Sequence, residues 1–549
     1  MHRSVRAAGV LLLAAAAVTA VATARPSDAE QPAGAQAVVR TTPPVPLVEL
    51  VAQGGVGRLY TADPREVDSA TAAGLKRQPG QVGFLDRESF TGSIPLFRLK
   101  PSSTASKWLF TASTAERDAL VAQKWIYEGV AGYVATQRST GFVQLRRFTN
   151  GQEWRLALED RTADLIAAGY TLDGPVGYVR QNYVRAGAVY FGMFHTGGHQ
   201  RIIDRTKEIY GRDNDWWGGV RDFHDGTHYA TDNWPDSDFS DLKPAIGYYD
   251  DSKPETLEKH ITQATSAGLS FFNFYWYWNS KTQTGTVTDA ALTAFLAARN
   301  KDSIDFTVGL CAHPFDGLSI PQAQFGTVAS TLTSRFLNQP NTLRTNDGRK
   351  ILNICDARGL GDGSTAQIKA FVDTVHQTAR SQLGEDVYVM INQAGFDPTQ
   401  VPAVNADAAY CTTDGPGVEG RSYDGYLAGQ RAFYQQGPGA YGRCVMSDFD
   451  ERPRYPIENA DLPTIRWFPD QSVAKFRQAI QNVKNDMATS TRPSTVDNLV
   501  YVYAWNEWHE GGFIEPSEHS GCAYLDALHD GLALQGPGCI SNPAGAPPS

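Results

Sequence analysis

The fold that we expect follows from residues 499–516, which read Leu499-Val-Tyr-Val-Tyr-Ala-Trp-Asn-Glu-Trp-His-Glu-Gly-Gly-Phe-Ile-Glu-Pro516. The first half of this stretch is β-branched and aromatic, which predicts a buried strand. The second half places two carboxylates, a histidine and aromatic rings directly behind that strand, and Gly511-Gly512 then lets the backbone turn. A (β/α)₈ barrel builds its active site in this way, at the carboxyl ends of its parallel strands.

The two acids of this stretch, Glu507 and Glu510, are the predicted catalytic pair. Two carboxyl groups can share acid and base roles when a glycosidic bond is cleaved, and aromatic rings stack on the apolar faces of sugars. In an apolar pocket, desolvation favours the protonated form of one carboxyl, which suits a general acid. We expect Trp505, Asn506 and His509 to contact the same substrate.

Two alternative interpretations of this stretch stay open. Asn506 can instead cap a helix whose first turn carries the two acids. His509 can instead make a structural hydrogen bond within its loop.

The length, composition and net charge limit the classes of protein to which the chain can belong. A chain of 549 residues is too long for one ordinary domain, and 42% hydrophobic with 20% charged residues is typical of a folded soluble protein. The formal net charge is −10, and no basic cluster is present. This charge argues against nucleic acid as a partner. The expected partner is a polysaccharide or an oligosaccharide.

Residues 1–24 read as a signal peptide. Arg3 and Arg6 give a positive beginning, an apolar run extends from Ala7 to Val21, and a small-residue cleavage site ends at Ala24. The apolar run is shorter than a membrane span needs, so we expect a secreted chain, with a retained anchor as the alternative. Residues 25–45 are rich in Pro, Ala and Gln and predict a linker.

The six cysteines form an even set, which fits an oxidising compartment. Cys522 and Cys539 bracket the C-terminal end of the chain and are candidates for one bridge. The other four lie in or beside predicted strands, where they either form two more bridges or remain buried thiols. No cysteine spacing suggests a zinc site, and we expect neither a metal nor a cofactor.

Residues 46–182 contain a weak internal repeat. Three similar blocks end near Gly83, Gly132 and Gly177, which are 49 and then 45 residues apart. One small unit used three times predicts a closed, β-rich module with pseudo-threefold symmetry. The blocks resemble a repeat module found attached to secreted bacterial hydrolases. No acid pair recurs in them, so we interpret the module as non-catalytic, either a glycan or cell-wall contact or a spacer.

Residues 187–535 alternate predicted strands with predicted helices, and residues 536–549 form a Gly- and Pro-rich tail. This alternation predicts a parallel sheet, and eight strands favour an α/β fold of the (β/α)₈ barrel type. Helices are expected near 289–299, 365–380 and 472–487. The strand candidates are Val189–Phe194, Phe271–Tyr275, Phe306–Leu310, Ile351–Cys355, Val387–Ile391, Ala408–Cys411, Cys444–Ser447 and Leu499–Ala504.

The clearest helix is predicted to begin at Ser252-Lys-Pro-Glu255, which is a capping-box pattern. Leu257, Ile261 and Ala264 would form its apolar face, and Gly268 would end it.

Further substrate contacts are expected from other strand ends. The second strand runs into Phe271-Phe-Asn-Phe-Tyr-Trp-Tyr-Trp-Asn279, which holds more large rings than can pack inward. We therefore predict that Tyr275, Trp276 and Trp278 line a sugar platform. His313 follows the third strand, and Tyr248 lies in Gly247-Tyr-Tyr-Asp250; both are weaker candidates.

The sequence also resembles a known family. Asn506-Glu-Trp-His-Glu-Gly511, followed by Ile514-Glu-Pro516, is similar to the signature of glycoside hydrolase family 99 and its relatives. Tyr190-Phe-Gly-Met-Phe-His195, Asn214-Asp-Trp-Trp-Gly218 and Gly247-Tyr-Tyr-Asp250 resemble the larger group of family-99-like barrels, some of which carry a glycosyltransferase label. The resemblance covers roughly residues 187–535.

The resemblance implies an endo-acting (β/α)₈ hydrolase that cleaves α-mannosidic bonds with retention and without metal. It also implies that the 2-hydroxyl of the sugar attacks the anomeric carbon. By this analogy Glu507 assists deprotonation of that hydroxyl, and Glu510 protonates the leaving oxygen and then activates water. The alternatives are a polysaccharide-related glycosyltransferase and a non-catalytic glycan-binding protein. The predicted signal peptide and the absence of a Gly-rich phosphate loop weigh against the former.

Overall fold

The computed structural model of the 549-residue chain describes residues 44–544, apart from 80, 140–141, 182, 199, 227–237, 287, 316, 394, 413–421, 455–465, 491–495 and 497. The predicted signal peptide and nearly all of the predicted linker lie outside the described residues, as does the end of the tail. In the part of the chain that the structure describes, no helix has the length and apolar character needed to cross a membrane.

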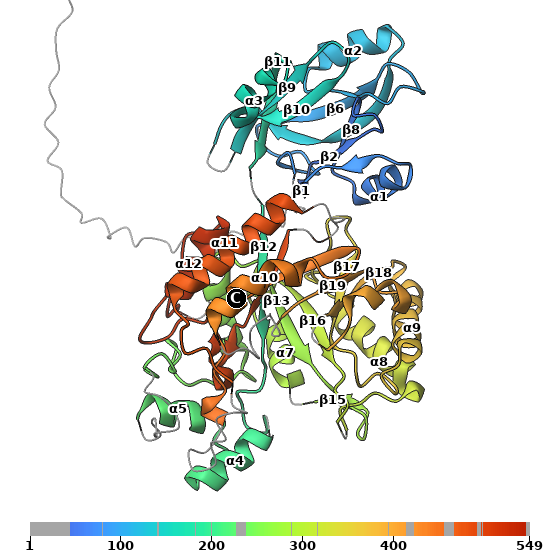
Figure 1. The fold of residues 1–549 in the computed structure, drawn as a ribbon. Coiled ribbons are helices and arrows are strands. Elements are labelled where there is room, and N and C mark those ends of the chain that lie inside the picture. Colours follow the sequence, from blue (N-terminus) through green and yellow to red (C-terminus); the bar gives the residue numbers. More distant parts are fainter. Residues whose placement is uncertain are drawn as a thin grey trace, which may run out of the picture. The chain divides into compact units, whose positions relative to one another are not determined.

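A closed barrel of eight parallel strands forms the larger part of the described chain (Figure 1). The first strand pairs with the last in parallel, with Arg185 opposite Leu499, so the sheet has no free edge. The predicted (β/α)₈ class is confirmed. In order around the barrel, the strands are β12 (Arg185–Tyr190), β13 (Phe271–Trp276), β16 (Asp305–Cys311), β17 (Lys350–Asp356), β18 (Val387–Asn392), β19 (Ala408–Tyr410), β20 (Ala440–Met446) and β21 (Leu499–Tyr503).

The first barrel strand begins earlier in the sequence than we expected. Hydrophobicity favoured Val189–Phe194, whereas β12 begins at Arg185. Arg185 is buried, and its Nη1 atom donates to the carbonyl oxygen of Arg344 over 2.7 Å. The apolar residues after Tyr190 instead leave the sheet at its carboxyl end.

Helices connect most of the barrel strands. They are α4 (Gln200–Tyr210), α5 (Gly218–His224) and α6 (Pro254–Ser266) before β13, then α7 (Thr288–Ala297), α8 (Phe325–Leu332), α9 (Thr365–Leu383), α10 (Tyr423–Tyr434) and α11 (Val473–Thr489), with α12 (Ala523–Leu532) after β21. Between β18 and β19 the described chain forms only two 3₁₀ turns, Pro398–Gln400 and Pro402–Val404.

Helix α6 has the predicted apolar face but a different beginning. Leu257, Ile261 and Ala264 are fully buried, as expected. Ser252 is not the N-cap, because its hydroxyl donates to Asp250 over 2.5 Å and the helix begins at Pro254. Proline at the first helical position needs no N–H partner, which explains this start.

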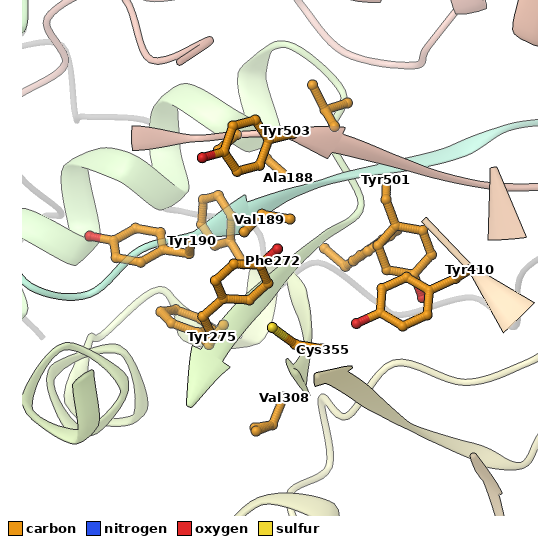
Figure 2. Packing of buried hydrophobic residues seen from close by; sticks show 14 of the residues in the cluster. Ala188, Val189, Tyr190, Phe272, Tyr275, Val308, Cys355, Tyr410, Tyr501 and Tyr503 are labelled. Carbon is orange, nitrogen blue, oxygen red and sulfur yellow. The ribbon is translucent and has the colours of Figure 1, made fainter. Parts of the chain in front are cut away.

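Aromatic side chains pack on both faces of the barrel sheet. Figure 2 shows Tyr190 beside Phe272, whose ring centroids are 5.4 Å apart, and Tyr410 beside Tyr501, at 4.9 Å. Tyr190 and Phe272 lie on the outer face, where they contact His260 of α6 and Phe295 of α7. Tyr501 lies on the inner face, where its hydroxyl is 3.2 Å from Asn353 Nδ2 and its ring contacts Phe271.

All six cysteines are paired in three disulfides. The expected bridge Cys522–Cys539 is present, and the open question about the other four is answered by Cys311–Cys355 and Cys411–Cys444. The first bridge joins β16 to β17, and the second joins the residue that follows β19 to β20. Disulfides of this kind persist in oxidising compartments, which is compatible with an extracellular protein.

The region before the barrel is rich in β-structure and repeats one unit three times. The helices of the repeats are α1 (Pro64–Ala72), α2 (Thr114–Ala122) and α3 (Thr162–Ala167). The strands are β1 (Val45–Pro46), β2 (Val48–Val51), β3 (Arg58–Thr61), β4 (Lys76–Arg77), β5 (Phe84–Leu85), β6 (Ser93–Lys100), β7 (Leu109–Thr111), β8 (Ile126–Ala135), β9 (Phe142–Thr149), β10 (Trp154–Leu158) and β11 (Thr171–Arg180).

Equivalent strands of the three repeats pair with one another in a ring. Strand β5 meets β8, β8 meets β11, and β11 meets β5 again. The pairs are Asp86 with Tyr133, Ala135 with Tyr178, and Arg180 with Phe84. This cyclic pairing is the pseudo-threefold arrangement that the repeat predicted.

The three repeat glycines lie where these strands meet. A Cβ atom on Gly83, Gly132 or Gly177 would come within 3 Å of a side chain from the neighbouring repeat. The neighbours are Val179, Leu85 and Val134, which stand two positions after the three glycines. Close packing of equivalent positions, together with φ angles of +89°, +153° and +135°, explains why glycine recurs.

A Gly177→Ala variant is therefore expected to destabilise this region by about 1–3 kcal/mol, because the new methyl group overlaps Val134. The matched control is Gly174→Ala, since Gly174 has a φ of +149° but nothing within 4 Å of a built Cβ. Amide hydrogen exchange on peptides from residues 46–180 measures the effect. Equal protection in the two variants would show that backbone conformation, and not packing, requires the glycine.

Candidate active site

A cavity of about 710 Å³ opens at the carboxyl end of the barrel. Its walls come from the ends of several strands and from the loops that follow them, where barrels of this type hold their active sites. One part of its lining consists of Tyr275, Tyr277, Arg454, Tyr503, Glu507 and Glu510. His313, Asp356 and Arg358 form another part of the lining.

The two predicted acids lie on one loop and reach this cavity together. After β21 the chain forms a short strand, β22 (Asn506–Glu507), and then one 3₁₀ turn, Trp508–Glu510. The Glu507 residue is 3% exposed, and both acids line the cavity. The turn brings side chains three positions apart to the same side, so one loop delivers both carboxyl groups.

Arg454 binds both carboxyl groups. Its Nη1 atom forms an ion pair with Glu510, and its Nη2 atom lies 3.8 Å from Glu507 Oε2. The Tyr503 hydroxyl donates a second hydrogen bond to Glu510. Glu510 is thus held by a cation and a phenol, whereas Glu507 Oε2 has no hydrogen-bond partner among the described residues.

The surroundings of Glu507 and Glu510 determine which of the two carboxyl groups is protonated. Burial, followed by the charge of Glu510, raises the pKa of Glu507 well above its usual range, and Arg454 acts in the opposite direction. Burial and the same two carboxylates also raise the pKa of Tyr503. This phenol therefore stays protonated and donates a hydrogen bond to Glu510. In the free protein the protonated carboxyl is therefore Glu507.

The two glycines after the pair give it room. Gly511 has a φ of +64°, which ends the 3₁₀ turn. A Cβ on Gly512 would lie 2.5 Å from the ring of Tyr503, so only glycine lets this ring approach Glu510 without a shift. The predicted Gly511-Gly512 turn thus has a second role, because it leaves space for the Tyr503 ring beside Glu510.

The other residues of the loop anchor it and do not line the cavity. Asn506 is fully buried, and its amide group bonds to both the N–H and the C=O of Phe191, over 2.8 and 3.0 Å. Asn506 is therefore not a helix cap. His509 stacks on Phe194 and donates to the carbonyl oxygen of Trp216 over 2.8 Å. Trp505 is fully buried against Phe272.

The aromatic run at the end of β13, residues 275–278, alternates between two environments. Tyr275 and Tyr277 line the cavity. The two expected platform residues, Trp276 and Trp278, are at most 2% exposed and donate to Asp289 and Gln324 outside the cavity. Successive side chains of a strand point to opposite faces, which explains why the tryptophans are not brought to the site.

Of the two weaker candidates, one is in the cavity. His313 lines it, close to Asp356. Tyr248 packs against Trp217 and Arg221 and is not part of the lining.

Sequence reasoning did not single out Tyr277, Tyr503 and Arg454 around the acid pair, or Asp356 and Arg358 elsewhere in the cavity. Tyr503 and Tyr277 are identifiable from strand alternation, because each stands two positions after an inward-facing tyrosine, Tyr501 or Tyr275. Arg454 follows the seventh strand, where a barrel loop meets the substrate, but no spacing in the sequence couples it to the distant acids.

The described residues contain one group of side chains within reach of a common metal ion, Cys522, Asp526 and Cys539. Its two sulfur atoms are joined in a disulfide and offer no thiolate ligand.

Two family models match parts of this chain. The model described as Glycosyltransferase WbsX matches residues 421–528, and the model described as domain of unknown function DUF5648 matches residues 46–180. The first match contains Arg454, Tyr503, Glu507 and Glu510, and the second contains the three repeats.

Among individual proteins, the chain is 24% identical over 327 residues to proteins named "Uncharacterized protein WxcX" from two strains of Xanthomonas campestris pv. campestris. The match covers 53% of this chain, and the chain spans less than half, 43%, of those relatives.

Among solved structures, the chain is similar to a GH99 endo-alpha-mannosidase from Bacteroides thetaiotaomicron, with 13% identity and a TM-score of 0.42. That match covers 64% of this chain and 97% of the other. A structure titled "Glycoside hydrolase-like protein" matches with 15% identity and a TM-score of 0.41, covering 64% of this chain and 94% of that one.

Proposed function

We propose that this protein is a secreted glycoside hydrolase that cleaves internal α-glycosidic bonds of a mannan-like polysaccharide with retention. The observation that carries the proposal is the convergence of Glu507 and Glu510 on one cavity. Burial also raises the pKa of Glu507, which favours its protonated form. A glycosidase needs one carboxyl that gives a proton and one that takes a proton.

The proposed reaction has two steps. In the first, the sugar's 2-hydroxyl attacks the anomeric carbon, Glu507 takes the hydroxyl proton, and Glu510 protonates the leaving oxygen as its bond to the anomeric carbon breaks. In the second, water opens the resulting 1,2-anhydro sugar, giving its proton to Glu510, and the 2-oxygen regains a proton from Glu507. Two inversions at the anomeric carbon give net retention, so this is a substrate-assisted variant of two-carboxylate catalysis.

This reaction begins with the proton on Glu510, whereas the free protein holds it on Glu507. Arg454 and Tyr503 both bind Glu510 in the free protein. We propose that a bound sugar takes over these contacts and that the proton moves within the pair.

A glycosyltransferase is the second candidate, and the match of residues 421–528 to the WbsX model favours it. The same pair would then activate an acceptor hydroxyl. A third candidate is a glycan-binding protein that uses the cavity without chemistry, although binding needs no carboxyl of raised pKa.

Release of reducing ends from a panel of α-linked mannans, glucans and arabinans separates the three candidates. We expect the wild type to release reducing ends from a mannan and the first product to keep the α configuration by NMR. Sugar transfer from a nucleotide sugar without hydrolysis would establish the transferase, and binding without release would establish the lectin.

The pH profile of kcat/KM is expected to be bell-shaped. The basic limb marks loss of the last proton of the pair, and burial together with mutual repulsion places it well above the usual pKa of glutamate. The acid limb marks uptake of a second proton. A profile whose basic limb falls in the ordinary glutamate range would contradict the assignment of the proton to Glu507.

A further inference from the structure

A second polar cluster lines the cavity in addition to the acid pair. It consists of His313, Asp356 and Arg358, named here the His–Asp–Arg wall. His313 Nδ1 lies 2.5 Å from one oxygen of Asp356. The Arg358 guanidinium donates to the same carboxylate through Nε, over 3.0 Å, and Nη2, over 2.7 Å.

Asp356 holds the other two residues of the wall. It is 4% exposed and accepts a further bond, over 2.8 Å, from the backbone N–H of Arg358. These donors outweigh the effect of burial and lower its pKa to about 2, so it is ionised wherever the protein is studied. A carboxylate so fully bonded has little capacity left for a ligand. Its role is to orient the imidazole and the guanidinium.

A disulfide fixes the backbone beneath the wall. Cys311 stands two positions before His313 and Cys355 one position before Asp356, and the two cysteines are bridged. The ends of β16 and β17 are therefore tied together at the point where each delivers its part of the wall. Gly395 adds space, because a Cβ there would lie 3.0 Å from Arg358 Nε.

Aromatic rings fix the imidazole further. Tyr277 and Phe315 both contact His313, with ring centroids 5.5 and 5.6 Å away. Because Asp356 engages Nδ1, Nε2 is the ring nitrogen that remains for the cavity. Phe315 is 61% exposed, so it offers an apolar surface at this side of the opening.

The wall lies near the acid pair, and Tyr277 joins the two. Tyr277 contacts His313. Burial, followed by the charges of Glu507, Glu510 and Asp356, raises the pKa of the Tyr277 hydroxyl. One extended ligand in the cavity can therefore meet both groups.

The charges of the cavity indicate what the wall binds. The described lining residues include three guanidiniums, and each is paired with a carboxylate. Arg358 pairs with Asp356, Arg454 with Glu510, and Arg466 with Glu451. Because these charges are already compensated, the cavity does not favour a charged substituent, whereas an oriented imidazole and guanidinium suit hydroxyl groups.

We propose that His313 and Arg358, oriented by Asp356, form a second subsite that binds hydroxyl groups of a neutral sugar adjacent to the one whose bond is cleaved. This inference rests on the proposed glycosidase function and adds to it a requirement for length: the substrate must extend beyond the bond that is cut.

Binding of an oligosaccharide ladder to the inactive Glu510→Gln protein tests the subsite. Calorimetry with α-mannooligosaccharides, from the disaccharide to the hexasaccharide, should show a gain in affinity at the length that reaches the wall. Adding His313→Ala or Arg358→Ala should remove roughly 10- to 100-fold of that gain. Affinity for the shorter sugars should stay unchanged.

Kinetics in the otherwise wild-type protein give a second readout. Each single variant should raise KM on the long sugars by the same factor, with little change in kcat. Asp356→Asn should act like them, and Asp356→Glu should restore part of the loss, because Asp356 works by positioning its two partners. Arg380→Ala serves as the control, since Arg380 is an exposed arginine that also pairs with an aspartate, Asp386.

The outcomes separate the subsite from the function. Equal losses on short and long sugars, or no loss, overturn the subsite while leaving the hydrolase in place. A length-dependent gain that the wall variants remove, in a protein that cleaves no polymer, upholds the subsite and overturns the hydrolase. A wild type that neither binds nor cleaves these sugars overturns both.

Discussion

Replacing Glu510 with glutamine is expected to lower kcat by about 10²–10⁴-fold, because the amide keeps the shape of the side chain but cannot transfer a proton. Substrate binding should persist, since the cavity and its other walls are unchanged. The measurement is reducing-end release under saturating polysaccharide, with binding followed separately by calorimetry.

Glu518→Gln is the matched control for this experiment. Glu518 is an exposed acid a few residues further on that pairs with Lys243, and the chemical change is identical. It should leave kcat unaltered. Unchanged activity in Glu510→Gln would remove this residue from the mechanism, and equal losses in both variants would point to a general effect on folding.

Replacing Arg454 with glutamine is expected to lower kcat/KM at neutral pH on the order of 10²-fold, because a fixed positive charge beside the reacting groups is lost. Arg454 acts to lower the pKa of Glu507, so its removal raises that pKa further. The proton of the pair is then held to higher pH. We therefore expect the basic limb of the pH profile to move upward.

Arg454→Lys separates charge from geometry. Lysine keeps the positive charge but cannot place one nitrogen on Glu510 and another near Glu507. The basic limb should return towards its wild-type position while part of the loss in kcat/KM remains. A basic limb that moves downward in Arg454→Gln would contradict the electrostatic account.

The fold was predictable because the barrel strands carry their signal locally. Leu499-Val-Tyr-Val-Tyr503, for example, is an unbroken run of apolar and aromatic residues buried on both faces, so its composition alone predicts a strand. The first strand was placed too late because Arg185 depends on a partner 159 residues away, the carbonyl oxygen of Arg344. Hydrophobicity carries no information about such a partner.

The site was predictable only where its functional residues lie close together in the sequence. Glu507 and Glu510 stand on one turn and were found together. The ring-rich run of residues 271–279 predicted a platform, but the number of rings does not show which of them face the cavity. Strand alternation turns Trp276 outward and leaves Tyr275 and Tyr277 in the cavity. Arg454 lies beside the two acids only in the folded barrel, where the strands that precede them, β20 and β21, are neighbours in the sheet.

The claim that both acids act on one sugar is tested most directly by kcat of the Glu507→Gln, Glu510→Gln double variant beside the two single variants. Residues that act as one unit show strongly non-additive losses. The account predicts that the double variant is barely slower than the slower single variant. A loss equal to the product of the two single losses would show that the carboxyl groups act independently, and the account would then be wrong.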